Sequence, residues 1–118
     1  MRAGVRLTAP PLLLGEVSSA VYKQHQSGAI NIEEAVTSLK DFDRLSIDSL
    51  APRTLSARAI EIADQFGLKW IYDAFYVALA EIVGCDLWTA DEALHAAVSG
   101  AHANVRLLSE YPLTRPTA

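Results

Sequence analysis

The sequence predicts an α/β domain with a parallel sheet flanked by helices. Short apolar runs of strand length alternate with longer segments in which apolar residues recur every three to four positions. Such alternation is typical of parallel sheets, because each strand reaches the next through a crossover that is usually a helix. The chain has 118 residues, 51% of them apolar and 20% charged, and no repeat or linker divides it. We therefore expect one domain over residues 1–111, followed by a loose tail over residues 112–118.

The first half of the chain predicts a strand, two helices and a second strand. Residues 5–7 are apolar enough for a short strand, and the proline pair after them suits the first turn of a helix that ends near Gly28. Asn31, with Glu34 three residues later, predicts a variant capping box that begins the second helix. Residues 45–47 alternate as in a brief strand. On the first helix, one face carries the apolar residues Leu13, Leu14, Val17, Ala20 and Val21. On the second helix, the residues expected to face inward are Ile32, Ala35, Val36, Leu39 and Phe42.

The second half predicts three helices and two strands. Residues 55–66 form an amphipathic helix that should stop at Gly67, because glycine favours the left-handed cap. After a very apolar helix, residues 86–89 are expected to form a strand that leads straight into the acidic first turn of a helix at Asp91. Residues 105–108 make the last strand.

Asp73 is the most informative residue, because it interrupts the most apolar helix. From Tyr72 to Val83 the chain is apolar on nearly every side, as in a helix buried in a core that ends at Gly84. Only Asp73 and Glu81 break this pattern, and they lie roughly 12 Å apart along the axis, too far to serve one site. A buried unpaired carboxylate costs several kcal/mol, so Asp73 needs a cation, hydrogen-bond donors or an exposed cleft. Alternatively, it caps the helix, where the first turn favours negative charge.

Two further carboxylates belong to the strand-exit side of the expected sheet. Glu16 lies on the helix after the first strand, and Asp91 follows the strand that ends at Thr89. Asp73, at the start of its helix, can lie on the same rim, where ligands of parallel sheets gather. Three carboxylates from separate segments suit Mg²⁺ or Mn²⁺, which prefer oxygen ligands. Capping of three separate helices is the alternative explanation.

Three blocks of sequence, in matching order and spacing, support a family resemblance. They read Leu-Thr-Ala-Pro-Pro-Leu-Leu-Leu-Gly-Glu-Val at residues 7–17, Tyr-Asp-Ala-Phe-Tyr-Val-Ala-Leu-Ala at residues 72–80 and Leu-Trp-Thr-Ala-Asp-Glu-Ala-Leu at residues 87–94. The chain resembles the PIN-domain nucleases, particularly the VapC-type toxin ribonucleases of prokaryotic toxin–antitoxin pairs. The resemblance extends over nearly the whole chain.

The resemblance implies a site and an activity. It makes Glu16, Asp73 and Asp91 the ligands of Mg²⁺ or Mn²⁺, and it places the hydroxyl of Thr89 beside them. Either Asp91 or Glu92 then orients the water that attacks an RNA phosphodiester. The expected partners are an RNA substrate, a cognate antitoxin and a second copy of the chain in a homodimer.

The chain departs from the family pattern at its start. Family members open with a central strand that ends in an aspartate ligand, before the equivalent of Leu7, whereas no aspartate precedes Asp41 here. The expected fold is therefore PIN-like but N-terminally incomplete, with strand edges left unpaired or paired to another chain. Two alternatives to an active nuclease follow: a non-catalytic PIN remnant that binds a partner or dimerises, and a structural α/β domain.

Composition limits how the chain can bind nucleic acid and where in the cell it is expected. The net charge of −4 excludes a broad basic surface that binds nucleic acid by phosphate neutralisation alone. Cys85 is the single cysteine, expected to be packed in the core. The apolar runs are too short to span a bilayer and the N-terminus does not resemble a secretory signal, so a cytoplasmic protein is expected. The histidines are expected at the surface or at helix ends: His25, His95 and His102. A core or an interface is expected for Trp70 and Trp88. A solvated face is expected for the cations Arg53, Arg58 and Lys69.

Overall fold

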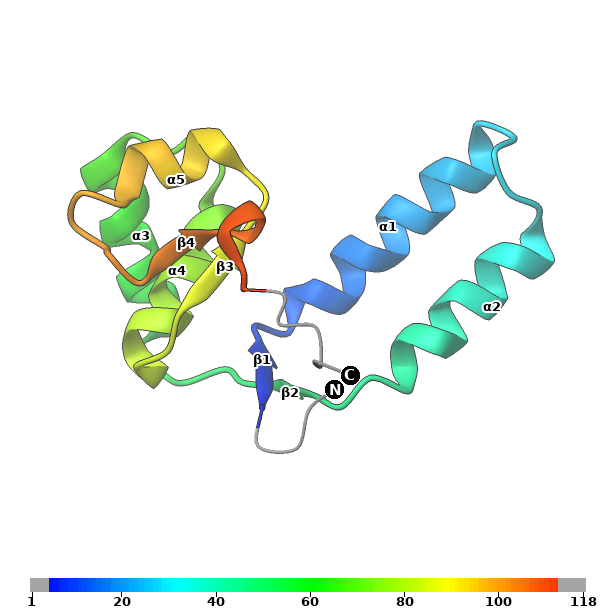
Figure 1. Cartoon of the computed structure of the whole chain (residues 1–118), viewed down its shortest axis with the longest axis horizontal. Coiled ribbons are helices and arrows are strands. Elements are labelled where there is room, and N and C mark those ends of the chain that lie inside the picture. The colour runs from blue at the N-terminus through cyan, green and yellow to red at the C-terminus, as the bar shows by residue number, and fades with distance from the viewer. Residues whose placement is uncertain (1–4, 113–118) are drawn as a thin grey trace, which may run out of the picture. The chain divides into compact units, whose positions relative to one another are not determined.

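A computed structural model describes residues 5–112, which belong to two compact units, unit 1 (residues 1–51) and unit 2 (residues 52–118). Residues 113–118 of the expected tail lie outside the described part of the chain. Figure 1 labels the elements. In unit 1 they are β1 (Leu7–Ala9), α1 (Leu12–Gln26), α2 (Ile32–Asp43) and β2 (Ile47–Ser49). In unit 2 they are α3 (Leu55–Phe66), α4 (Ile71–Val83), β3 (Leu87–Thr89), α5 (Glu92–Val98), β4 (Val105–Leu107) and the 3₁₀ turn η1 (Leu108–Glu110).

Unit 1 is a parallel strand pair joined by a helical hairpin. Strands β1 and β2 pair with Leu7 opposite Ile47. The guanidinium of Arg6 donates to the Asp48 carboxylate across this pair at 2.7 Å. Helices α1 and α2 lie side by side and form the crossover between the two strands (Figure 1). A parallel pair requires a long connection of this kind, because the chain must return to the starting end of the first strand.

The start of α2 has the capping box that the sequence predicts. The Asn31 side chain accepts a hydrogen bond from the Glu34 N–H at 2.7 Å, and the Asn31 N–H donates to the Glu34 carboxylate at 3.1 Å. The prediction that Ile32 and Val36 of α2 face inward is wrong, however, because both are exposed. Helix α1 has no buried residue and α2 has only Ala35, because within unit 1 each helix packs mainly against the other. The apolar residues of the hairpin that remain exposed include Leu14, Tyr22, Ile32 and Val36.

Unit 2 combines a helical hairpin with a second parallel strand pair. Helices α3 and α4 pack along each other, and α3 ends at Gly67, whose φ of +62° is the left-handed cap that glycine permits. Strands β3 and β4 pair in parallel with Leu87 opposite Val105. Helix α4 contacts β3, and α5 joins β3 to β4 and contacts β4. The buried apolar residues of this unit are Leu55, Ala59, Ile62, Ala74, Val77, Ala78, Leu79, Ala80, Leu94, Val98 and Val105.

The described strands form two separate two-stranded sheets, β1–β2 and β3–β4. The predicted α/β class and the parallel pairing are confirmed, and every predicted strand is present to within two residues. Strand pairs this short depend on helices packed against them. No helix among residues 5–112 is long and apolar enough to cross a membrane.

Candidate active site

Asp91 lies immediately beyond the carboxyl end of β3, where the sequence places it. Its backbone N–H donates to the Thr89 hydroxyl at 3.0 Å, and its carboxylate Oδ1 accepts from the Leu94 N–H at 3.0 Å. Asp91 is therefore the N-cap of α5, so the capping explanation accounts for one of its two oxygens. The second oxygen, Oδ2, has no hydrogen bond within the described residues, and the residue is exposed. A carboxylate held by one oxygen at a strand exit can still offer the other to a cation or a water.

Asp73 lies in the first turn of α4 and is half-buried. The chain runs along α4 to Val83 and then returns through β3, which α4 contacts. From Asp73 to Val83 the helix rises about 15 Å. The extended return from Gly84 to Asp91 spans at most about 23 Å. These lengths allow Asp73 and Asp91 to lie at the same end of unit 2, as the sequence predicts.

Glu16 belongs to unit 1, where it is exposed on α1, whereas Asp73 and Asp91 belong to unit 2. Each unit therefore contributes only part of the predicted ligand set. Within residues 5–112, no group of three or more histidine, cysteine, aspartate or glutamate residues is placed so that it could hold a metal ion. The convergence of Glu16, Asp73 and Asp91 thus stays a prediction, and the support for a hard cation is the chemistry of the donors, which are all carboxylate oxygens.

A cavity of about 290 Å³ opens beside Asp91, beyond the carboxyl ends of β3 and β4. It is lined by Thr89, Ala90, Glu92, Leu107, Leu108 and Ser109. Two of these residues, Thr89 and Glu92, are the supporting residues that the sequence predicts. The strand exits of unit 2 therefore combine candidate reacting groups with a space for a ligand.

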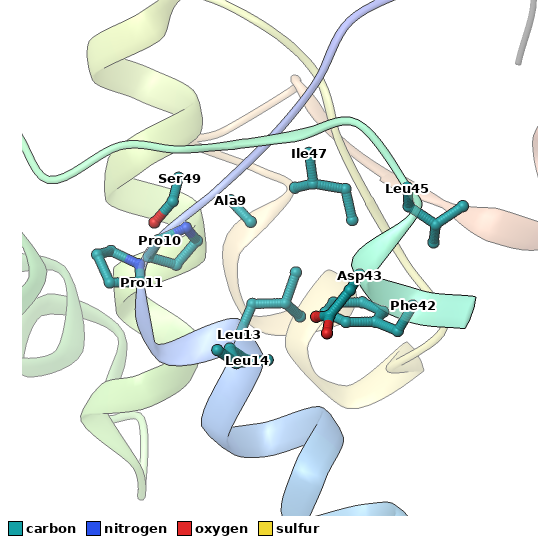
Figure 2. Close-up of a pocket in the computed structure, with 10 residues that line it drawn as sticks. All are labelled: Ala9, Pro10, Pro11, Leu13, Leu14, Phe42, Asp43, Leu45, Ile47 and Ser49. Atoms are coloured by element: carbon teal, nitrogen blue, oxygen red, sulfur yellow. The ribbon is translucent and has the colours of Figure 1, made fainter. Parts of the chain in front are cut away.

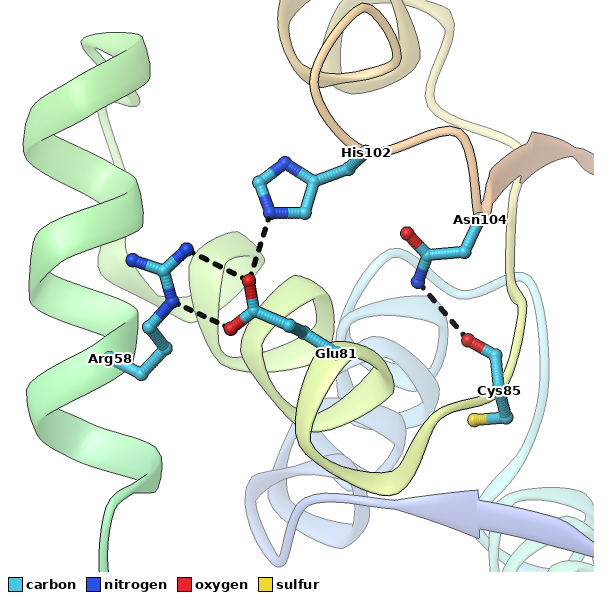
Figure 3. A network of polar contacts seen from close by, with 5 residues as sticks. All are labelled: Arg58, Glu81, Cys85, His102 and Asn104. Carbon is cyan, nitrogen blue, oxygen red and sulfur yellow. Dashed lines mark hydrogen bonds and ion pairs between the residues drawn. The ribbon is translucent and has the colours of Figure 1, made fainter.

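A second polar cluster lies near the opposite end of α4 (Figure 3). The Arg58 guanidinium makes two hydrogen bonds to the Glu81 carboxylate, at 2.6 and 2.8 Å, and His102 Nε2 lies 3.5 Å from the same carboxylate. The hydrogen bond from Arg58 lowers the pKa of the Glu81 carboxyl, against the opposing effect of desolvation. The same hydrogen bond raises the pKa of Arg58. This Arg58–Glu81–His102 network joins α3, α4 and the segment before β4.

Three predictions need correction in this part of the chain. His102 is buried rather than at the surface, and its ring packs edge-to-face on Phe66 at 5.5 Å. Arg58 pairs with Glu81 rather than lying on a merely solvated face. Cys85, expected in the core, is exposed in the turn after α4 and accepts a hydrogen bond from the Asn104 side chain through its carbonyl (Figure 3). The sequence does contain a signal for this network. A carboxylate such as Glu81 in an apolar helix indicates a cation on a neighbouring element, and Arg58 of α3 is that cation.

Unit 1 has a larger cavity, of about 400 Å³, between the start of α1 and the end of α2 (Figure 2). It is lined by Ala9, Pro10, Pro11, Leu13, Leu14, Phe42, Asp43, Leu45, Ile47 and Ser49. The lining is mostly apolar and includes none of the predicted site residues. This cavity therefore suits the apolar side chains of a partner better than hydrolytic chemistry.

Comparison with protein families identifies the family of the chain. The protein-family model described as PIN domain matches residues 2–99, a range that includes Glu16, Asp73 and Asp91. No curated protein matches the chain significantly.

Proposed function

The chain belongs to the PIN-domain family, and from this premise we propose that it is a metal-dependent endoribonuclease of the VapC toxin type. Family membership supports a nuclease-type function at the level of the whole domain. The observation that carries the finer proposal is the turn from Thr89 to Asp91. It places an exposed carboxylate, with one oxygen unoccupied by protein donors, at the exit of a parallel strand.

In the proposed mechanism, Glu16, Asp73 and Asp91 would hold Mg²⁺ or Mn²⁺. A divalent cation bound there would lower the pKa of water and offset the charge of an RNA phosphodiester. The Thr89 hydroxyl already accepts a hydrogen bond from the Asp91 N–H, so its own proton remains available to donate to a phosphate oxygen or to water. Asp91 or Glu92 orients the attacking water.

Cleavage of RNA with and without divalent metal tests this proposal. We expect Mg²⁺- or Mn²⁺-dependent cleavage that EDTA suppresses and that Asp73→Asn reduces at least about 100-fold, the usual effect of losing an important catalytic contact. Asp41→Asn is the matched control, because Asp41 is an exposed aspartate of α2 whose described partner is Arg44. Cleavage that persists in EDTA, or that Asp73→Asn leaves unchanged, contradicts the proposal.

Asp73→Asn also separates metal binding from helix capping. If Asp73 is a ligand, its replacement weakens Mn²⁺ binding and leaves the stability of the metal-free protein unchanged or improved, because it reduces repulsion among carboxylates. If Asp73 only stabilises the start of α4, stability falls by roughly 1 kcal/mol while Mn²⁺ affinity stays the same. Calorimetric titration together with thermal melts distinguishes the two results.

A second candidate function is a non-catalytic, partner-binding PIN module. The apolar cavity of unit 1 and the exposed apolar residues Leu14, Ile32 and Val36 of the hairpin favour it. Its proposed partners are a cognate antitoxin and a second copy of this chain, in a cytoplasmic complex. Sedimentation analysis of the wild type and Leu14→Glu measures self-association. A dimer abolished by Leu14→Glu, in a protein that cleaves no RNA, favours this candidate over the nuclease.

A further inference from the structure

The cavity beyond β3 and β4 has two kinds of wall. Ala90, Leu107 and Leu108 give apolar surface, and Leu108 is 54% exposed. Thr89, Ser109 and Glu92 are the residues of the lining with polar side chains. Its volume of about 290 Å³ is just below the range of ligand pockets, roughly 300–1,000 Å³. The cavity therefore suits a small, flat group with a polar edge.

The charge of the described lining disfavours a phosphate as the occupant. Among residues 5–112, no lysine, arginine or histidine lines this cavity, and the charged residue of the described lining is the acid Glu92. A phosphate in the cavity would meet that negative charge without a compensating donor cation. An ionised carboxylate only accepts hydrogen bonds, so the favoured occupant presents N–H groups and carries no negative charge.

Glu92 is available for such a contact. Among residues 5–112 it makes no hydrogen bond or ion pair, in contrast to its neighbour Asp91, whose Oδ1 caps α5. The two adjacent acids therefore differ in what they can do. Asp91 is oriented by the turn after β3, whereas Glu92 is an exposed residue of the cavity lining.

We propose that this cavity binds one unstacked base of a single-stranded RNA and that Glu92 selects guanine. The inference rests on the proposed function, since it assigns a recognition subsite to the same substrate and leaves the orientation of the attacking water to Asp91. Guanine presents N1–H and N2–H side by side, so both carboxylate oxygens can accept. Uracil presents one N–H between two carbonyl oxygens, which the carboxylate repels, and adenine and cytosine each pair a single amino group with a ring acceptor. Apolar walls around an unpaired base are a usual means of RNA recognition.

Binding measured without catalysis tests this inference. The probes are fluorescein-labelled hexanucleotides, U₆ and its variant with guanosine at the third position, titrated with the full chain in EDTA and followed by anisotropy. We expect the guanosine probe to bind about tenfold more tightly, the usual discrimination of a bidentate base contact. Inosine at the same position keeps N1–H and lacks the amino group, so it should lose most of that preference.

Variants of two exposed acids complete the test. Glu92→Gln replaces one acceptor by a donor and should bring the guanosine and uridine probes to within about twofold of each other. Glu110→Gln removes the same charge from the neighbouring η1 turn, outside the lining, and should keep the wild-type preference. Circular-dichroism melts verify that both variants are folded.

The outcomes separate this inference from the nuclease proposal. Equal binding of the guanosine and uridine probes by the wild type, or a preference that survives Glu92→Gln, overturns the guanine pocket, even if Mg²⁺-dependent cleavage is observed. Failure to bind either probe overturns it as well. A guanosine preference that depends on Glu92 supports the pocket even where no cleavage occurs, a result that counts against the nuclease alone.

Discussion

Replacing Glu81 with glutamine tests the Arg58–Glu81–His102 network. In the wild type, the Glu81 carboxylate accepts two hydrogen bonds from Arg58, at 2.6 and 2.8 Å. Glutamine has nearly the same size, but its neutral amide offers Arg58 one acceptor oxygen and one NH₂ donor. Hydrogen bonds to charged groups contribute about 1.5–3 kcal/mol when well shielded, and exposed ion pairs about 0.2–1 kcal/mol. The Arg58 and Glu81 side chains are 30% and 37% exposed, so solvent screening places this contact between these limits. We expect a loss of about 1–2 kcal/mol at pH 7.

The pH dependence of this loss follows from the lowered pKa of Glu81. A carboxyl whose pKa is lower in the folded state binds its proton less readily when folded. Its contribution to stability is therefore fully present above its unfolded pKa of about 4.3 and disappears as the pH falls through the folded value. The stabilities of wild type and Glu81→Gln, measured by urea denaturation and circular dichroism, should differ most at pH 7 and differ less as the pH falls below the unfolded pKa.

Two comparisons make this prediction refutable. Asp41→Asn removes an exposed contact at 3.5 Å, between side chains 81% and 63% exposed, and should change stability by less than about 0.5 kcal/mol. The double variant Arg58→Gln, Glu81→Gln should cost less than the sum of the single variants, because both remove the same pair. A loss for Glu81→Gln no greater than for Asp41→Asn, or one that is the same at pH 3 and pH 7, refutes the argument.

Three further predictions concern caps and the cysteine. Asn31→Ala removes the capping box of α2 and should lower stability by about 1 kcal/mol in urea denaturation, whereas Asn31→Asp should not. Gly84→Ala meets no atom within 4 Å, yet it should also cost about 1 kcal/mol in thermal melts, because φ is +79°. Cys85 is exposed, so a thiol reagent should modify it in the native protein nearly as completely as in urea; strong protection in the native state contradicts this placement.

Local signals in the sequence were sufficient to predict where the elements begin and end. Asn31 with Glu34 begins α2 through hydrogen bonds within four residues, and Gly67 and Gly84 end their helices through their own positive φ angles. Asp91 follows β3 and begins α5 as expected. These features depend on near neighbours in the chain, and for that reason a single sequence reveals them.

Features that depend on distant neighbours were predicted less well. The apolar pattern of α2 is helical, but the pattern does not say how many other elements surround the helix, so Ile32 and Val36 were wrongly expected to be buried. His102 follows α5 in a turn whose sequence gives no sign of burial, and its environment comes from Phe66 and Glu81. The acids of the candidate site have the same limitation, because their convergence depends on how separate segments pack.

Helix α4 offers a way to distinguish a structural carboxylate from a functional one within a single element. Both Asp73 and Glu81 interrupt its apolar surface, and they lie roughly 12 Å apart along the axis. Arg58 compensates the charge of Glu81, so Glu81 has a structural explanation. If Asp73 is a metal ligand, Asp73→Asn weakens Mn²⁺ binding while stability is kept, and Glu81→Gln lowers stability while Mn²⁺ binding is kept. Because both residues share one helix, a general disturbance of α4 cannot produce these two opposite results.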